Sequence, residues 1–464
     1  MTARLTSGSP GLDAILGGGL LAHSTSLIIG LPGSGKTILA QQYLFANATR
    51  ERPGLYCPTV SESLEKMLGF AQSQAYFDRE ALGKRVFYED LSGALHAGGL
   101  PAVLDHLTTL LQDRRPGLVV IDSFKALRAY AATEEMFRRF LHAMAERLAG
   151  YALSSLWVGE YAAEQLESMP EGAVVDAIIS LRTDRLGARD SRALRVLKLR
   201  GSAFLTGEHA YEIGGEGLDA FPRLADPIEA REQALDSAAA PAEPAVLRSG
   251  IPGLDELVGG FPAGASILLM GPTGAGKTVF GLHFVLQGLR HGEPGVIATF
   301  QEDPVQLERV AASFGLSLAH PGLSLLYRAP VGVRLDEWVR ELLGIVEATG
   351  AKRMMIDGLG DLSAVAWDPG SFREYLYSLL QRLARAGVTV MLTQEIPELF
   401  GITSVVGVPS SHAVDFVLVL QYVDREGLWT RAVRVLKSRG RSHSSAAAPL
   451  RIIDRGIEVA SVGE

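Results

Sequence analysis

Two eight-residue segments of the chain carry glycines, a lysine and a threonine at the spacing that wraps a phosphate group. The first segment consists of Gly30, Leu31, Pro32, Gly33, Ser34, Gly35, Lys36 and Thr37. The second consists of Gly271, Pro272, Thr273, Gly274, Ala275, Gly276, Lys277 and Thr278. Both match G-x-x-x-x-G-K-[ST], in which glycines let backbone N–H groups curl around phosphate oxygens. The lysine reaches the β- and γ-phosphates and the threonine hydroxyl binds Mg²⁺, so the segments predict two nucleotide sites.

Each segment also stands where a phosphate-binding loop has to stand, between a strand and a helix. A short apolar run precedes each loop, at residues 27–29 and 267–270, and a helical run follows it. The positive end of that helix points at the bound anion. A single match to so short a pattern can arise by chance, whereas two matches in the same context indicate real nucleotide sites.

Two aspartates are candidates for holding Mg²⁺. Asp122 ends the apolar run 118–121, and Asp357 ends the apolar run 354–356. A hydrophobic strand that ends in Asp is the Walker B pattern, whose carboxylate holds Mg²⁺ or the water around it. The predicted Mg²⁺ ligands are therefore Thr37, Asp122, Thr278 and Asp357.

Hydrolysis further requires a group that orients the attacking water. The natural place is the end of the strand after the phosphate-loop helix, where the two copies place Glu62 and Glu302. We interpret these glutamates as candidate bases. The alternative is that each only caps the following helix, since acidic side chains are favoured at a helix start.

A basic element recurs near the end of each half of the chain. Lys198 and Arg200 precede Gly201, and Lys437 and Arg439 precede Gly440. Lysine and arginine two residues apart project on the same face of a strand. They could form a solvated edge that discourages aggregation. Their recurrence beside glycine favours a second interpretation, a pair of cations that reaches the γ-phosphate of a neighbouring subunit.

The repeated motifs belong to one duplicated domain. The offset between equivalent residues changes only from 242, for Asp13 and Asp255, to 239, for Arg200 and Arg439. So constant an offset means two copies of a whole domain. Alternating strands and helices predict an α/β fold, with a mainly parallel sheet flanked by helices in each copy. An Ala/Pro/Glu-rich stretch places the boundary, giving domains at 1–224 and 247–464 and a linker at 225–246.

Composition excludes several classes of protein. The chain has 464 residues, of which 47% are hydrophobic and 21% charged, as expected for globular domains. The single cysteine, Cys57, excludes an intrachain disulfide and a cysteine-rich metal site. We see no signal peptide or membrane span, and expect a cytoplasmic protein without membrane contacts. A net charge of −8 argues against general nucleic-acid binding.

These motifs together resemble those of KaiC and the wider KaiC-like group of RecA-superfamily ATPases. The resemblance covers nearly the whole chain and includes the S-G-x-P-G-L-D entry at residues 7–13 and 249–255. It implies two tandem RecA-like P-loop domains, a homo-hexameric ring, and ATP with Mg²⁺ bound between subunits. The two K-x-R elements would then act on the nucleotide of the next protomer. His443 matches a histidine that follows the element in the family, whereas the first domain has Phe204 there.

The departures from the family pattern concern catalysis. KaiC-like proteins usually carry two adjacent glutamates at the base position, and here Ser61 and Gln301 replace the first of each pair. Clock members autophosphorylate an adjacent Ser-Thr pair, and the matching residues here are Ser411 and His412. The long C-terminal tail of those members is also not seen in this sequence, so a full circadian oscillator is not expected.

Three functions remain open at this point. The first is an ATPase ring in signalling, with protein partners and serine autokinase activity at Ser411. The second is a nucleotide-gated scaffold with little turnover. The third is a recombinase- or helicase-like motor on DNA, against which the acidic charge and the lack of a basic, glycine-rich loop both count.

Overall fold

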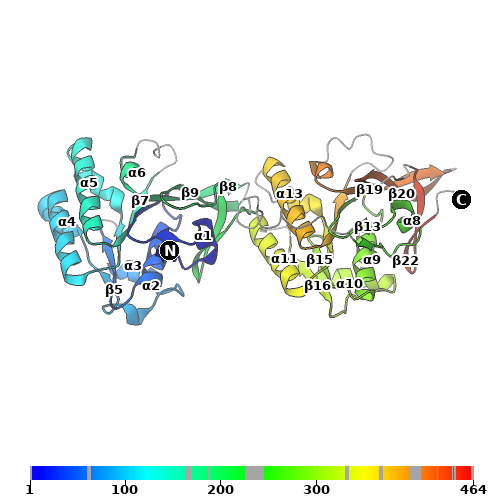
Figure 1. Cartoon of the computed structure of the whole chain (residues 1–464), viewed down its shortest axis with the longest axis horizontal. Helices are drawn as coiled ribbons and strands as arrows, with labels where there is room; N and C mark the ends of the chain where they lie inside the picture. The colour runs from blue at the N-terminus through cyan, green and yellow to red at the C-terminus, as the bar shows by residue number, and fades with distance from the viewer. Residues whose placement is uncertain are drawn as a thin grey trace. The chain divides into compact units, whose positions relative to one another are not determined.

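The computed structural model describes two compact units, residues 1–226 and 227–464 (Figure 1). The described residues are 3–59, 64–161, 165, 169–186, 189–224, 245–329, 334–364, 369–396, 409–425, 427–440, 443 and 446–460. Nearly all of the predicted linker, at 225–244, lies outside them, so the predicted domain boundaries stay a prediction.

The first unit is built on a sheet of nine strands. In spatial order they are β11 (Gly217–Phe221), β10 (His209–Gly214), β9 (Arg189–Leu199), β8 (Ala177–Leu186), β3 (Thr25–Gly30), β7 (Ser154–Glu160), β6 (Leu118–Asp122), β4 (Gly54–Pro58) and β5 (Val86–Tyr88). The strands from β8 to β5 run parallel, and β9, β10 and β11 follow beyond β8, each antiparallel to the strand before it. A separate short pair joins β1 (Arg4–Leu5) to β2 (Leu20–Leu21).

Helices cover both faces of this sheet because its parallel strands are apolar on both sides. The described helices are α1 (Pro10–Ile15), α2 (Lys36–Asn47), α3 (Leu64–Ala71), α4 (Ser92–Arg114), α5 (Glu134–Gly150) and α6 (Glu171–Val174), with 3-10 turns η1 (Arg79–Ala81) and η2 (Phe124–Tyr130). Ile28 packs into the core on the α1 and α2 side, and its neighbours Leu27 and Ile29 pack into the core under α4 and α5. The central strand β3 is thereby buried on both faces.

The second unit repeats this arrangement. Its strand order is β16 (Leu323–Tyr327), β15 (Gly295–Thr299), β17 (Arg353–Asp357), β18 (Thr389–Glu395), β14 (Ser266–Gly271), β19 (Phe416–Arg425), β20 (Leu428–Ser438), β21 (Ala448–Ile453) and β22 (Gly456–Val459). Its described helices are α8 (Leu254–Val258), α9 (Lys277–Arg290), α10 (Pro304–Ser313), α11 (Leu335–Thr349), α12 (Leu359–Ala364) and α13 (Pro369–Arg385), with the turn η4 (Pro409–His412). A short pair joins β12 (Val246–Leu247) to β13 (Phe261–Pro262).

The expected fold class is confirmed in both units. Strands β16 to β19 are parallel and β20 to β22 are antiparallel, so each strand of the second sheet has a counterpart in the first. In each unit the strand before the phosphate loop, β3 or β14, lies inside the parallel part. Among the helices in the described ranges, none is long and apolar enough to cross a membrane.

Candidate functional site

Each phosphate loop leaves the carboxyl end of a central strand and enters a helix. Strand β3 ends at Gly30 and helix α2 begins at Lys36, while β14 ends at Gly271 and α9 begins at Lys277. The residue before each helix is a glycine with a left-handed backbone, at φ 89° for Gly35 and 101° for Gly276. A side chain at either position would be strained, so the loop needs glycine there to turn its N–H groups toward an anion.

The two lysines lie inside their own loops. Lys36 Nζ donates to Leu31 O at 2.8 Å, and Lys277 Nζ donates to Gly271 O and Pro272 O, both at 2.9 Å. Burial lowers the pKa of each ammonium, while nearby carboxylates act in the opposite sense. A phosphate placed in the loop would compensate this buried positive charge, which is the electrostatic fit that a nucleotide requires.

The predicted Mg²⁺ ligands meet in both units. Thr37 Oγ1 donates to Asp122 Oδ2 at 2.7 Å, and Thr278 Oγ1 donates to Asp357 Oδ2 at 3.0 Å. A second hydroxyl also holds each carboxylate: Tyr56 donates to Asp122 at 2.6 Å, and Thr393 donates to Asp357.

The chemistry of this donor set fits Mg²⁺. Burial raises the pKa of both aspartates, and a cation bound there would offset that cost. The ligands are hard oxygens, as Mg²⁺ prefers. The described residues contain no group of three or more His, Cys, Asp or Glu that could hold a metal ion. Mg²⁺ is commonly bound through one or two carboxylates together with substrate phosphates and waters, and the Thr–Asp pairs suit that mode of binding.

Glu302 lies at the edge of the second site. Phe300 N–H donates to Asp357 O at 3.3 Å, which places the following residues beside Asp357. Burial raises the pKa of the half-buried Glu302, and the negative charge of Asp357 adds to the shift. Its Oε2 atom is buried and has no hydrogen-bond partner among the described residues. Such a carboxyl is suited to accept a proton. The equivalent Glu62 and its neighbour Ser61 lie outside the described residues.

The two K-x-R elements lie at the opposite end of the strands from the phosphate loops. Lys198 is in register with Ile178, which in turn pairs with Leu27 in the first half of β3. Lys198 Nζ donates to Gly172 O at 2.8 Å, and Arg200 forms an ion pair with Asp176 at 3.5 Å.

The second unit repeats this placement. Lys437 Nζ donates to Ser411 O at 3.1 Å and to Val414 O at 2.5 Å, and Arg439 pairs with Asp415 at 3.5 Å. Asp415 also accepts from the backbone N–H of Ser266, the first residue of β14. At about 3.3 Å per residue, the backbone of each lysine lies about 10 Å, and that of each arginine about 16 Å, along the strand from the end that carries the phosphate loop.

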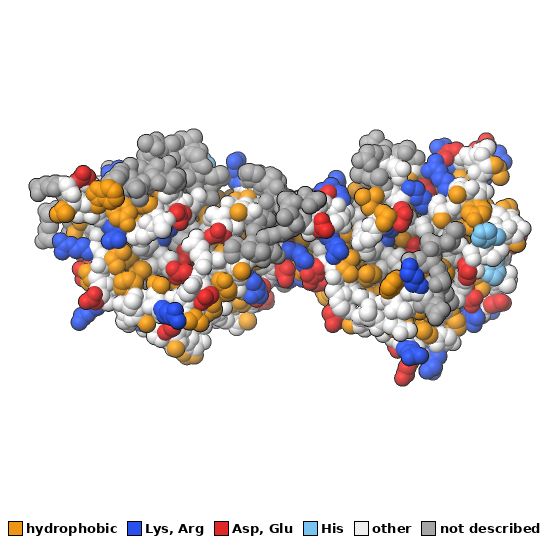
Figure 2. Space-filling model, turned by 180° about the vertical axis from the view of Figure 1, so that it is seen from behind, with side chains coloured by type: hydrophobic (Ala, Val, Ile, Leu, Met, Phe, Trp, Pro, Cys, Tyr) orange, Lys and Arg blue, Asp and Glu red, His pale blue; other side chains and the backbone are white. Residues whose placement is uncertain are grey.

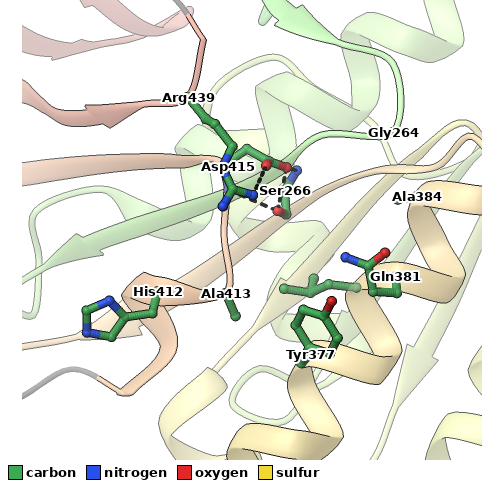
Figure 3. Close-up of a pocket in the computed structure, with 10 residues that line it drawn as sticks. Gly264, Ser266, Tyr377, Gln381, Ala384, His412, Ala413, Asp415 and Arg439 are labelled. Carbon is green, nitrogen blue, oxygen red and sulfur yellow. Dashed lines mark hydrogen bonds and ion pairs between the residues drawn. The ribbon is translucent and has the colours of Figure 1, made fainter. Parts of the chain in front are cut away.

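A pocket of about 160 Å³ lies beside the second element (Figure 3). Its lining includes Asp415 and Arg439 together with Tyr377 and Gln381 of α13. Figure 3 shows His412 at its margin, with the ring turned away from the Asp415–Arg439 pair. His412 is exposed, whereas Ser411 beside it is only 7% exposed.

His443, the other residue implied by the resemblance, is exposed, and its neighbours on both sides lie outside the described ranges. Phe204, its counterpart in the first domain, packs against the core on the α1 and α2 side.

Several polar residues of the two sites were missed by the sequence reasoning. Tyr56 and Thr393 hold the aspartates, and neither belongs to a motif. Glu160 and Glu395 end β7 and β18 in register with Gly30 and Gly271, and Thr273 of the second phosphate loop donates to Glu395. The signal for these glutamates was available, because the same strand ends in Glu in both copies.

The fold and the site define two phosphate-loop ATPase domains of the α/β class, each with the loop at the carboxyl end of a mostly parallel sheet. A sequence model of the KaiC ATPase family matches residues 5–225 and 247–464, and the chain belongs to this family. It is therefore a KaiC-family ATP-binding protein, and the expected resemblance is confirmed.

Curated relatives match over almost the full length. The chain is 28% identical over 466 residues to the circadian clock oscillator protein KaiC of Picosynechococcus sp.. The aligned region covers 97% of this chain and 88% of that protein. It is 28% identical over 465 residues to KaiC 1 of Synechocystis sp., with 97% and 87% covered. It is 27% identical over 478 residues to the circadian clock protein KaiC3 of Synechocystis sp., with 98% and 91% covered.

Proposed function

We propose that the protein hydrolyses ATP with Mg²⁺ at both nucleotide sites and that neighbouring subunits of a homo-hexameric ring complete each site. One observation carries this proposal: each K-x-R element lies toward the start of the parallel strands, away from its own phosphate loop, and its arginine, Arg200 or Arg439, is exposed there. Cations placed there can reach a γ-phosphate only if it belongs to another subunit. A closed ring supplies such a neighbour for every site.

The proposed roles follow the two copies of the domain, 1–224 and 247–464. The two phosphate loops bind the triphosphates, and Thr37, Asp122, Thr278 and Asp357 bind Mg²⁺. Glu62 and Glu302 act on the attacking water. The nucleotide of the next subunit is contacted by Lys198, Arg200, Lys437, Arg439 and His443. Mg²⁺ would neutralise charge that develops on the phosphate oxygens.

Signalling is the biological role we propose for such a ring, through protein partners that recognise its nucleotide state. Autophosphorylation at Ser411 is a secondary activity in this proposal. Ser411 is 7% exposed, so the serine must become accessible before a phosphoryl group can reach it. A cytoplasmic location stays a prediction from the sequence.

Two alternatives predict different measurements. A nucleotide-gated scaffold would bind ATP and assemble but release little phosphate. A motor on DNA would need a basic track. On the face shown in Figure 2, the Lys and Arg side chains are interspersed with Asp and Glu, which agrees with the acidic net charge and favours a protein that does not bind nucleic acid generally.

Ring formation should depend on nucleotide. Because ATP would lie between subunits, it binds the assembled form better and shifts the equilibrium toward it by mass action. Light scattering at micromolar protein should show a monomer or small species without nucleotide and a ring mass with ATP·Mg²⁺. A monomer under both conditions would contradict the ring.

Replacing Glu302 by Gln should lower turnover at the second site by about ten- to a hundredfold, the scale of a lost general base. Nucleotide affinity should persist, since the phosphate loop and the Mg²⁺ ligands are unchanged.

Because the pKa of Glu302 is raised, the rate of the unmodified chain should begin to fall at a higher pH than it would with an ordinary glutamate. Phosphate release measured against pH tests this, with Glu347→Gln on the exposed side of α11 as the matched control. An unchanged rate in Glu302→Gln would remove the base from this position.

A further inference from the structure

Gln301 and Asp361 form a contact next to the Mg²⁺ carboxylate of the second site. Gln301 Nε2 donates to Asp361 Oδ2 at 3.0 Å. Both side chains lie against Gly358, the residue directly after Asp357: a Cβ atom built on Gly358 would come within 2.8 Å of Asp361 Oδ2 and 3.3 Å of Gln301 Cγ. The glycine therefore leaves room for an amide and a carboxylate side by side at the edge of the nucleotide site.

The backbone fixes both partners relative to Asp357. Strand β15 ends at Thr299, in register with Asp357, so Gln301 leaves the sheet beside that aspartate. Asp361 stands in the first turn of α12, which begins two residues after Asp357, and its backbone N–H donates to Gly358 O at 3.0 Å. Neither side chain needs a long reach to meet the other.

We propose that Asp361 is a positioning residue that holds the Gln301 carboxamide so that it orients the attacking water in the second site. This inference rests on the proposed hydrolysis at that site. An amide cannot take up a proton, but its oxygen can accept a hydrogen bond from water and align it with the γ-phosphorus, as a glutamine does in GTPases. Asp361 engages the amide nitrogen, and this leaves the amide oxygen for the water.

In the hydrolysis step, one bond forms, one bond breaks and one proton is accepted by a residue of the site. The water oxygen forms a bond to the γ-phosphorus while the bond from that phosphorus to the β,γ-bridging oxygen breaks, giving ADP and inorganic phosphate. The proton of the water passes to the carboxylate of Glu302. In this arrangement Gln301 directs the water, Glu302 takes the proton and Asp361 keeps the amide in the correct orientation.

The first domain lacks this pair. Ala126 stands four residues after Asp122, where Asp361 stands four residues after Asp357, and Ser61 takes the place of Gln301. Replacing Ser61 or Gln301 by Glu, the residue that KaiC-like proteins usually carry there, should therefore affect the two sites differently. Gln301→Glu would set two carboxylates against each other, which raises the pKa of one and disturbs the site. The same change combined with Asp361→Ala removes that conflict.

The inference is tested by measuring phosphate release by the whole chain. The rate of the Lys277→Ala chain is subtracted from each measurement, and the difference is the rate of the second site. Asp361→Ala should lower kcat by about ten- to a hundredfold with little change in KM, since misplacing a catalytic group by about 1 Å has that effect. Asp361→Asn should retain most of the rate, because the asparagine oxygen still accepts from the Gln301 amide. Ser363→Ala, on the same helix, is the matched control.

The double variants separate positioning from a general structural effect. Asp361→Ala should cost nothing further in a Gln301→Ala chain, since its action passes through Gln301. Gln301→Glu with Asp361→Ala should be faster than Gln301→Glu alone. An unchanged kcat in Asp361→Ala, or equal losses in Asp361→Asn and Asp361→Ala, would overturn the inference. If subtracting the Lys277→Ala rate leaves nothing for the unmodified chain, the proposed hydrolysis at this site fails, and the inference falls with it.

Discussion

Replacing Lys36 or Lys277 by alanine is expected to remove nucleotide binding from that lysine's own domain only. Each ammonium lies inside one loop, within 2.9 Å of its carbonyl oxygens, and so serves one triphosphate. A charge-assisted bond to phosphate contributes about 1.5–3 kcal/mol, so losing it weakens binding by about ten- to a hundredfold or more. Equilibrium binding of labelled ATP should fall from two tight sites per chain toward one.

Exposed lysines on the same domains supply the controls. Lys84→Ala and Lys352→Ala change charge by the same amount outside the phosphate loops and should keep both sites. The Lys36→Ala, Lys277→Ala double variant should bind no nucleotide tightly. Retention of two tight sites in either single variant would contradict the assignment of the loops.

Replacing Arg200 or Arg439 by alanine is expected to lower turnover at the corresponding sites by about a thousandfold, because an arginine that reaches a neighbour's γ-phosphate has an effect of this order or larger. Stability should change little. The side chain of Arg439 is 69% exposed, and so open an ion pair contributes at most about 1 kcal/mol. Asp415 also keeps its bonds to Ser266 after the change.

A mixing experiment decides whether the arginine acts between subunits. Chains with Lys277→Ala and chains with Arg439→Ala should each lack activity at the second site. When the two are mixed, some interfaces join an intact phosphate loop to an intact Arg439, about a quarter of them in a random ring. Phosphate release should return in the mixture to a corresponding fraction of the unmodified second-site rate.

The controls for this experiment follow from the same geometry. Arg451→Ala, an exposed arginine of β21, should leave turnover unchanged. If Arg439→Ala chains keep full activity, the arginine has no role in hydrolysis. If the mixture stays inactive while both variants still assemble into rings, Arg439 does not complete a neighbour's site.

Much of the fold could be predicted because its signals are local. The apolar run 267–270, the glycine-rich loop and the helix that begins at Lys277 are contiguous in the chain, so their order alone indicates a phosphate loop at a strand end. The two aspartates can also be recognised from local sequence, because each ends an apolar strand, β6 or β17. The duplication needed only a comparison of residue numbers. Glu62 and nearly all of the linker lie outside the described residues, so these stay predictions.

The sequence by itself determined that this protein has two α/β domains, each with a phosphate loop and an acidic strand end, because local spacing and strand-ending residues encode those features. Only the tertiary structure decided which residues meet. Tyr56 reaches Asp122 from a neighbouring strand, Gln301 reaches Asp361 across 60 residues, and Lys437 lies at the far end of the sheet from its own loop. The reason is physical: parallel strands pair through long crossovers, and their register depends on packing of the whole sheet rather than on nearby residues.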